Sequence, residues 1–272
     1  MIIKKDLERG YYMKVIIMTD LEGISLVDSI DMIDETQDGY RFACRRLMED
    51  VNAAVQGAVD AGADEILVCD GHGSGKNFIE GKLDPRATQF WTLNDTSIFD
   101  GCVAYLEIGL HAKPGTLNGF LDHVQSSKKW YNYYINGKTY GELAQGAAYC
   151  GAYGVPTVMV SGDEAACNEA KGMIDGIVCA CVKKGIGRNR AECLPSEEAL
   201  KRIREAACEG VRKAADIKPY TISLPAEIKL EVYRTDYCDE IMERMPHLTR
   251  LDARTVVKTI DKVETYSDML FG

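Results

Sequence analysis

Two short apolar segments joined by one long helical segment constrain the fold of this chain most. Val15 to Thr19 is apolar and mostly β-branched, the pattern of a strand buried on both faces. From about Asp38 to Ala61 apolar residues recur at helical spacing, and Gly62 provides a helix stop. Ile66 to Cys69 is a second apolar strand. This strand–helix–strand order predicts parallel strands joined by a right-handed crossover.

The rest of the chain continues in the same manner. We expect strands at 102–108, 156–160, 228–233 and 255–260, helices at 141–154 and 197–215, and a hairpin at 130–140. Asn136-Gly137 favours the tight primed turn of that hairpin, and Asp163 is suited to cap the helix that follows it. The fold class that this pattern predicts is α/β, a mostly parallel sheet flanked by helices, with a smaller α+β C-terminal part.

No internal repeat and no low-complexity linker divides the chain. The segment from Gly185 to Pro195 is the one place where the sequence suggests a boundary between domains. We therefore expect an α/β domain of residues 13–190 that carries the functional site, followed by an α+β part of residues 191–272.

The composition and charge of the chain exclude some classes of function. The chain has 272 residues and a formal net charge of −10, so it lacks the basic surface that nucleic acids and anionic membranes attract. No apolar run approaches the roughly 18 residues of a membrane span, and the first residues lack the apolar middle of a signal peptide. We expect a cytoplasmic protein that binds neither nucleic acid nor membrane.

Ten cysteines are spread along the chain without a CxxC pair. In a chain of this length without an export signal, they indicate reduced, mostly buried thiols rather than a disulfide framework. Cys179 and Cys181 alternate along an expected strand, which favours core packing on one face.

Histidines follow two of the expected strands. His72 and His111 come just after strand ends, and His123 lies in the Gly-rich segment beyond. In parallel α/β sheets, ligands bind outside the carboxyl ends of the strands. Any one of these could be an ordinary loop histidine, but two of them together with an acidic strand end favour a site.

Carboxylates occupy the same kind of position. Asp20 and Glu22 follow the first strand two positions apart, which in extended backbone points both to one side. Two carboxylates there repel each other unless a cation lies between them, which favours a metal ion, with Asp20 placed to bridge two ions. Glu142 lies in the first turn of an expected helix, where the dipole favours a carboxylate. Alone, each feature has an ordinary explanation as a turn or a helix end.

The segment from Asp70 to Asn77 is rich in glycine but is not a phosphate-binding loop. That loop needs Gly, four residues, then Gly-Lys-Ser/Thr. Here Asp70 stands at the first glycine position and Asn77 replaces the hydroxyl residue. The glycines instead let the backbone turn tightly, so that His72 can face a site.

Five short motifs follow one another along the chain: Asp20-Leu21-Glu22-Gly23, Asp70-Gly71-His72, Gly109-Leu110-His111-Ala112, His123 and Gly141-Glu142-Leu143. In this order they resemble the M55 D-aminopeptidases of the dipeptide-transport-operon type. The resemblance runs from Met13 almost to the C-terminus and includes residues 156–163 and Cys193-Leu194. Each motif alone is weak, whereas five in order are specific.

The resemblance implies a two-zinc aminopeptidase that removes the N-terminal residue of short peptides, D-residues included. It implies these metal ligands: Asp20, Glu22, His72, His111 and Glu142. It implies His123 as the catalytic histidine. The family forms ring-like homo-oligomers, so the resemblance also implies such an assembly here, such as a decamer. Two positions depart from the family pattern and bear on substrate choice: Glu107 stands in a usually apolar segment, and Asp122 stands where a small residue is common.

The donor set agrees with this resemblance. Two imidazoles and three carboxylates suit zinc or another first-row divalent ion better than calcium, which prefers oxygen alone. With one bridging carboxylate and two other donors per ion, positions stay open for water, which ionises near neutral pH on a metal and can attack a polarised carbonyl. His123 could then shuttle a proton or stabilise the oxyanion.

Two other functions stay open. A metal-dependent amidohydrolase acting on a non-peptide amide would share the ions and differ only in its pocket. A non-catalytic, metal-stabilised binding or assembly protein is the second, although His123 argues against it because a structural site leaves no open coordination position.

The first residues of the chain differ from the rest. Met1 to Tyr12 is polar without an apolar pattern, and the resemblance begins at Met13. Glu8-Arg9-Gly10 can be encoded by a purine-rich run, which in bacterial messages precedes true start codons. We expect that the natural protein often starts at Met13 and that residues 1–12 are an extension that packs on nothing. The intact mass of the protein from its native source would test this.

Overall fold

Within residues 12–271, which the computed structural model describes, seven strands form sheet A in the order β3-β2-β1-β4-β7-β8-β9. The strands are β1 (Lys14–Thr19), β2 (Glu65–Asp70), β3 (Ala87–Gln89), β4 (Cys102–Leu110), β7 (Thr157–Asp163), β8 (Val178–Gly187) and β9 (Arg190–Cys193). All neighbours are parallel except β8 and β9. The expected parallel pairing of the first two strands is confirmed, with Ile16 of β1 opposite Leu67 of β2.

Chain order reverses at β1. The strands β2 and β3 lie on one side of it, and β4, β7 and β8 lie on the other. The crossovers on the two sides therefore leave the sheet on opposite faces and open a crevice at the carboxyl ends of β1 and β4. The loops that follow these strands meet at that crevice.

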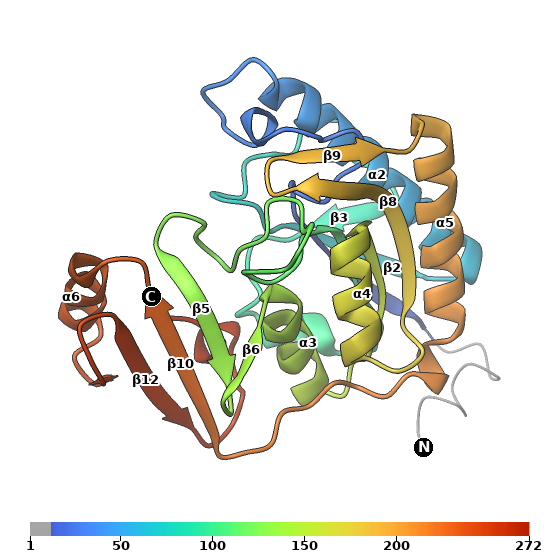
Figure 1. Ribbon diagram of the computed structural model, residues 1–272. Helices are drawn as coiled ribbons and strands as arrows, with labels where there is room; N and C mark the ends of the chain where they lie inside the picture. The colour runs from blue at the N-terminus through green and yellow to red at the C-terminus, as the bar shows by residue number, and fades with distance from the viewer. Residues whose placement is uncertain (1–11, 272) are drawn as a thin grey trace.

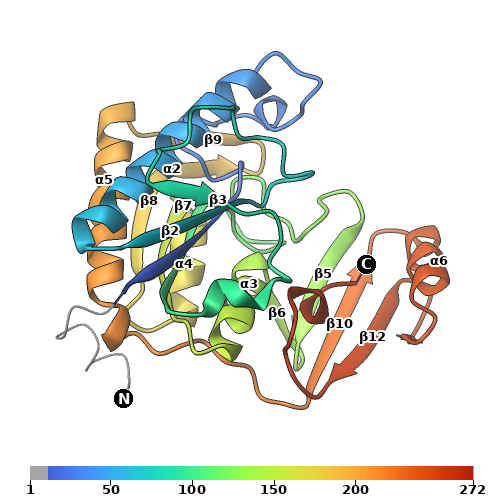
Figure 2. The same cartoon turned by 180° about the vertical axis from the view of Figure 1, so that it is seen from behind.

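Helices cover both faces of sheet A. On one face α2 (Tyr40–Ala61) and α5 (Ser196–Arg212) lie side by side, and on the other lie α3 (Glu142–Ala152) and α4 (Glu164–Met173) (Figure 1, Figure 2). The expected stop at Gly62 is confirmed, because this residue has a left-handed φ of 98°. Asp163 caps α4 as expected by accepting the Ala166 N–H. Gly57 lets α2 approach α5, since a Cβ there would lie 2.3 Å from the Arg204 carbonyl oxygen.

A second, antiparallel sheet, sheet B, stands beside α3 (Figure 1). Its order is β11-β12-β10-β5-β6. The strands are β5 (Trp130–Ile135), β6 (Lys138–Tyr140), β10 (Ala226–Val232), β11 (Thr249–Arg250) and β12 (Thr255–Ile260), accompanied by α6 (Thr235–Arg244) and the 3-10 helix η4 (Tyr266–Met269). The expected hairpin is confirmed, with φ of 49° at Asn136 and 79° at Gly137. Sheet A with its helices and sheet B confirm the expected fold class.

Alternation along β4 separates two apolar cores. Leu106 and Ile108 belong to the core that includes α2 and α5. Tyr105 belongs to the core between α3 and sheet B. The division of the chain between residues 190 and 191 stays a prediction: it falls inside β9, sheet B takes β5 and β6 from before it, and α5, which follows it, packs on α2.

Of the expected N-terminal extension, residues 1–11 lie outside the described residues. The Tyr12 hydroxyl donates to Glu65 Oε2 at 2.8 Å. The expectation that residues 1–12 pack on nothing is therefore wrong at Tyr12.

All ten cysteines lie in the described part of the chain and are free thiols, as expected. Across residues 12–271, no helix is long and apolar enough to cross a membrane.

Candidate metal centre

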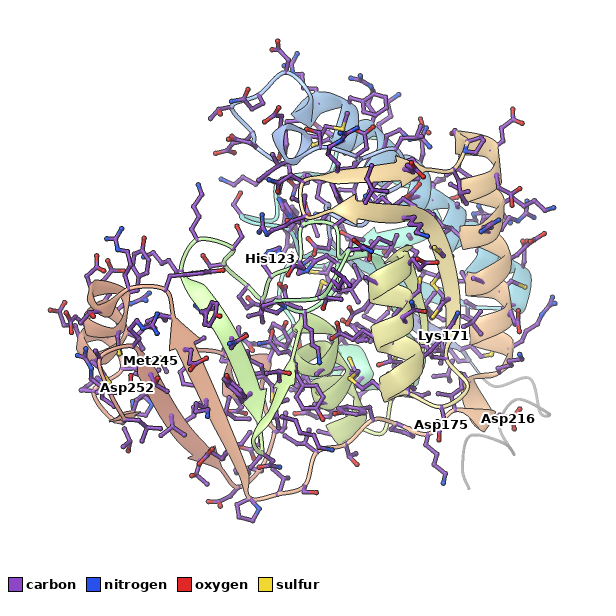
Figure 3. All side chains as sticks on the ribbon, viewed as in Figure 1. His123, Lys171, Asp175, Asp216, Met245 and Asp252 are labelled. Carbon is purple, nitrogen blue, oxygen red and sulfur yellow. The ribbon has the colours of Figure 1, made fainter. Side chains whose placement is uncertain are left out.

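Six side chains that the sequence singled out gather at the carboxyl ends of β1, β2 and β4. Their ligand atoms form two groups, each with all atoms within 4.8 Å of one another: Asp20, Glu22 and His72 in the first, and His111, His123 and Glu142 in the second. Figure 3 labels His123 among the loops between β5 and sheet A. The fold thus brings all the predicted site residues together.

Asp20 connects the two groups. Its Oδ1 lies 3.0 Å from His72 Nδ1, and its Oδ2 lies 3.3 Å from His111 Nε2. A carboxylate whose two oxygens face different donor groups is placed to bridge two cations. The arrangement therefore offers two adjoining half-sites that share one side chain.

The backbone that carries Asp20 and Glu22 is not the extended one expected. The strand β1 ends at Thr19, and a turn follows in which the Ile24 N–H donates to the Leu21 carbonyl at 3.3 Å. Both carboxylates nevertheless reach His72 Nδ1, at 3.0 Å from Asp20 and 2.9 Å from Glu22.

Gly23 determines where this turn lies. Its N–H donates to the Gly109 carbonyl of β4 at 2.6 Å, and a Cβ at Gly23 would lie 2.2 Å from the Leu110 carbonyl oxygen. The turn can therefore press against β4 only because this residue has no side chain.

Backbone carbonyls orient two of the histidines. Nδ1 of His111 lies 3.0 Å from the Ala112 carbonyl, and Nδ1 of His123 lies 2.7 Å from the Leu121 carbonyl. In each ring Nδ1 is therefore the donor, and Nε2 is left free toward the carboxylates, as in metal-ligating histidines. The two rings stack with centroids 3.9 Å apart. Geometry alone allows His123 to bind a metal or to carry a proton.

The electrostatics of the centre leave a carboxylate oxygen without a partner. Burial lowers the pKa of His72, but Glu22 and Asp20 outweigh it and raise this pKa to about 12. Burial and the charge of Glu22 raise the pKa of Asp20 to about 7. The hydrogen bond from His72 goes to Asp20, so Glu22 Oε2 is buried without a donor although His72 Nδ1 is 2.9 Å away.

A divalent cation fits this centre. The unpartnered oxygen of Glu22 and the repelling Asp20–Glu22 pair both need positive charge, and a buried carboxylate without it is costly. Imidazole nitrogens beside carboxylate oxygens are the donors that zinc accepts. The residues present therefore fit the metal that the sequence predicted.

Lys183 of β8 holds the turn after β1. This side chain is 2% exposed. Its Nζ donates to the carbonyls of Glu22 at 2.5 Å, Ile24 at 2.9 Å and Val27 at 2.5 Å. Nothing in the sequence indicates this role, because a lysine in an apolar strand is usually a solvated charge at the strand end.

Asp70 and Asn77 hold the loop that carries His72. The Asn77 N–H donates to Asp70 Oδ2 at 2.6 Å, and Asn77 Nδ2 donates to the His72 carbonyl at 2.8 Å. The two residues that exclude a phosphate-binding loop are therefore the ones that fix this loop.

Two further residues at the site were not assigned from the sequence. The Gln125 N–H donates to Glu142 Oε1 at 2.7 Å, and Gln125 Nε2 donates to Glu142 Oε2 at 3.2 Å. Glu107 is buried beside the centre, where burial raises its pKa to about 8 although the Tyr105 hydroxyl donates to it. For these two residues, the one indication in the sequence is the apolar run around Glu107.

Asp122, the second departure from the family pattern, supports the loop before His123. Its Oδ2 accepts the Gly115 N–H at 2.6 Å, and its Oδ1 lies 3.4 Å from Arg188 Nε. Asp122 therefore stabilises the conformation of the loop before His123.

Comparison with known proteins identifies the family of this chain. The model of the M55 peptidase family, D-aminopeptidase, matches residues 13–271. The chain belongs to this family. The resemblance inferred from the five motifs is thereby confirmed, and the chain is a metallopeptidase of the aminopeptidase type, as expected.

Two individual proteins show how far the similarity extends. A D-aminopeptidase of Bacillus subtilis (strain 168) is 30% identical over 219 residues, which cover 77% of this chain and 77% of that protein. A solved structure described as "Zn-dependent D-aminopeptidase DppA from Bacillus subtilis, a self-compartmentalizing protease" superposes with a TM-score of 0.87 at 25% identity. The match covers 94% of both chains.

Replacing Lys183 tests how the turn after β1 is held. Lys183→Met fills the same space but removes the Lys183 donor from three buried carbonyls, of which only Ile24 keeps a backbone donor among the described residues, the Val27 N–H, so we expect a loss of about 3 kcal/mol in the free energy of unfolding. The matched control is Lys184→Met, because Lys184 is exposed and forms an ion pair with exposed Glu164. Urea unfolding of both variants measures the difference, and equal stabilities would show that Lys183 does not hold the turn.

Proposed function

We propose that this chain binds two zinc ions and uses them to remove the N-terminal residue of short peptides, D-aminoacyl substrates included. The observation that carries the proposal is Asp20, whose two oxygens face His72 at 3.0 Å and His111 at 3.3 Å. The similarity to a solved structure described as zinc-dependent supports the choice of metal.

The proposed ligands divide between two half-sites. Asp20, Glu22 and His72 would hold one ion, and Asp20, His111 and Glu142 would hold the other. Bound there, the ions supply Lewis acidity, which polarises a carbonyl and makes water a nucleophile near neutral pH. The protein contributes the geometry: carbonyl-anchored rings and clamped loops that keep the donors in place.

His123 lies between the half-sites. Its Nε2 is 3.9 Å from Glu22 Oε1 and 3.9 Å from Glu142 Oε1. Because Leu121 holds the Nδ1–H, Nε2 is free to accept a proton from water and return it to the amine that leaves. We propose that His123 is the catalytic acid and base.

Two cavities meet at the centre. A cleft of about 550 Å³ runs over it, and a pocket of about 100 Å³ shares Asp20, Gly71, Gln125 and Glu142 with that cleft. The cleft is lined with carboxylates, Asp31, Asp34 and Glu35 among them, which favours the positively charged end of a peptide. The small pocket has room for one side chain, as removal of a single terminal residue requires.

An amide-release assay tests the proposed activity. The zinc-loaded chain should release ammonia from D-aminoacyl amides, and removal of metal by a chelator should abolish the reaction until zinc is restored. A panel that includes L-aminoacyl amides and non-peptide amides separates an aminopeptidase from an amidohydrolase. No release from any amide would leave a binding or assembly function.

Single substitutions separate the role of His123 from those of the ligands. We expect His123→Ala to retain its zinc and to lose about 10²- to 10⁴-fold in turnover, the usual contribution of a general acid or base. His72→Ala and His111→Ala should lose zinc as well. Metal content and turnover are measured on the same samples, and loss of zinc from His123→Ala would make this histidine a ligand instead.

We also propose that the chain works in the cytoplasm as a homo-oligomer, such as a ring-like decamer. The description of the solved relative as self-compartmentalizing supports an assembly, and Leu117, 87% exposed, and Trp91, 74% exposed, offer apolar contact surface. Sedimentation equilibrium should give about ten times the mass of one chain. A monomer at micromolar concentration would contradict the proposal.

A further inference from the structure

A buried carboxyl group without a cationic partner lies next to the proposed metal centre. Glu107 of β4 is 5% exposed, and within residues 12–271 no lysine, arginine or histidine forms an ion pair with it. The Tyr105 hydroxyl donates to it. Burying an ionised carboxylate without a positive partner costs free energy, so a ligand that brings a positive charge would stabilise the ionised form of Glu107.

The structure makes room for Glu107. A Cβ at Gly146 of α3 would lie 2.6 Å from Glu107 Oε1 and 2.7 Å from the Tyr105 hydroxyl oxygen. The glycine therefore leaves space for the carboxyl group on the face of sheet A that is covered by α3 and sheet B. Gly146 of α3 thus leaves space for the carboxyl group, and Tyr105 of β4 donates a hydrogen bond to it.

Glu107 lines the small pocket described above, which shares Asp20, Gln125 and Glu142 with the cleft. Met18, Tyr105 and Tyr266 also line it, and it is bordered by Ile108 and Leu110, whose side chains belong to the core with α2 and α5. Apolar and aromatic side chains beside Glu107, with Asp20 and Glu142 where the pocket meets the cleft, match an aliphatic chain that ends in a positive charge.

The depth of Glu107 in the pocket determines which amine of a substrate can reach it. Glu107 lies opposite Met18, two residues before Asp20, which at about 3.3 Å per residue places it roughly 7 Å below the level of Asp20. The α-amine of a peptide is bonded to the carbon beside the reacting carbonyl and stays near the metal centre. An amine at the end of a long side chain reaches the level of Glu107.

We propose that Glu107 makes this pocket selective for a terminal residue whose aliphatic side chain ends in an amine, as in lysine or ornithine. The stem packs against Met18 and Tyr266, and the ammonium donates to Glu107, a charge-assisted hydrogen bond. The inference rests on the proposed aminopeptidase function, because that function places the terminal residue in the pocket.

Calorimetric titration of the zinc-loaded full chain tests this without turnover. The probes are D- and L-lysine and D- and L-norleucine, which has the same six-carbon chain but a hydrogen atom in place of the ammonium. Wild type should bind lysine about tenfold or more tightly than norleucine, the value of one charged hydrogen bond. In Glu107→Gln and Glu107→Leu this preference should fall to about one. Glu169→Gln, a half-buried carboxylate outside the pocket, is the matched control and should keep the preference.

Two results would overturn the inference. One is a wild type with no preference for lysine. The other is an equal loss for lysine and norleucine in well-folded Glu107→Gln, which would assign the carboxyl group to the α-amine that both ligands share. Amide hydrolysis on the same samples separates the two proposals: a lysine preference without hydrolysis contradicts the aminopeptidase alone, and hydrolysis without the preference contradicts the selectivity alone.

Discussion

The mutual repulsion of carboxylates at the ends of β1 and α3 is the constraint on which the rest of the site depends. Asp20 and Glu22 face the same nitrogen of His72, and Glu142 faces His111 at 3.1 Å. Such a cluster persists in a buried crevice only if positive charge is supplied and the backbone cannot relax away. Imidazoles supply part of that charge, and divalent ions are proposed to supply the remainder.

The fold resists this relaxation by holding each loop from outside the centre. Lys183 bonds three carbonyls of the turn after β1, and Asn77 bonds the His72 carbonyl. Gln125 donates twice to Glu142. The donors are therefore positioned before any ligand arrives, which lowers the cost of binding. The crossover reversal at β1 gathers these loops at one end of sheet A.

Local features of the sequence predicted the frame and the donors, whereas long-range packing determined the rest. The strand before Asp20 and the loop of His72 follow from apolar runs and glycines that lie within a few residues. A turn at Asp20 was one explanation of the sequence, but its position could not be predicted, because it depends on the close approach of Gly23 to the backbone of β4. Lys183 is an ordinary charge in the sequence, and Glu107 stands out only because its neighbours are apolar; the assembled sheet shows that both are buried.

Anomalous diffraction at the zinc edge, from crystals grown with zinc, tests the central claim most directly. The account predicts two peaks per chain, each within coordination distance of one Asp20 oxygen, with His72 beside one peak and His111 beside the other. A single peak, or two peaks that do not share Asp20, would contradict it.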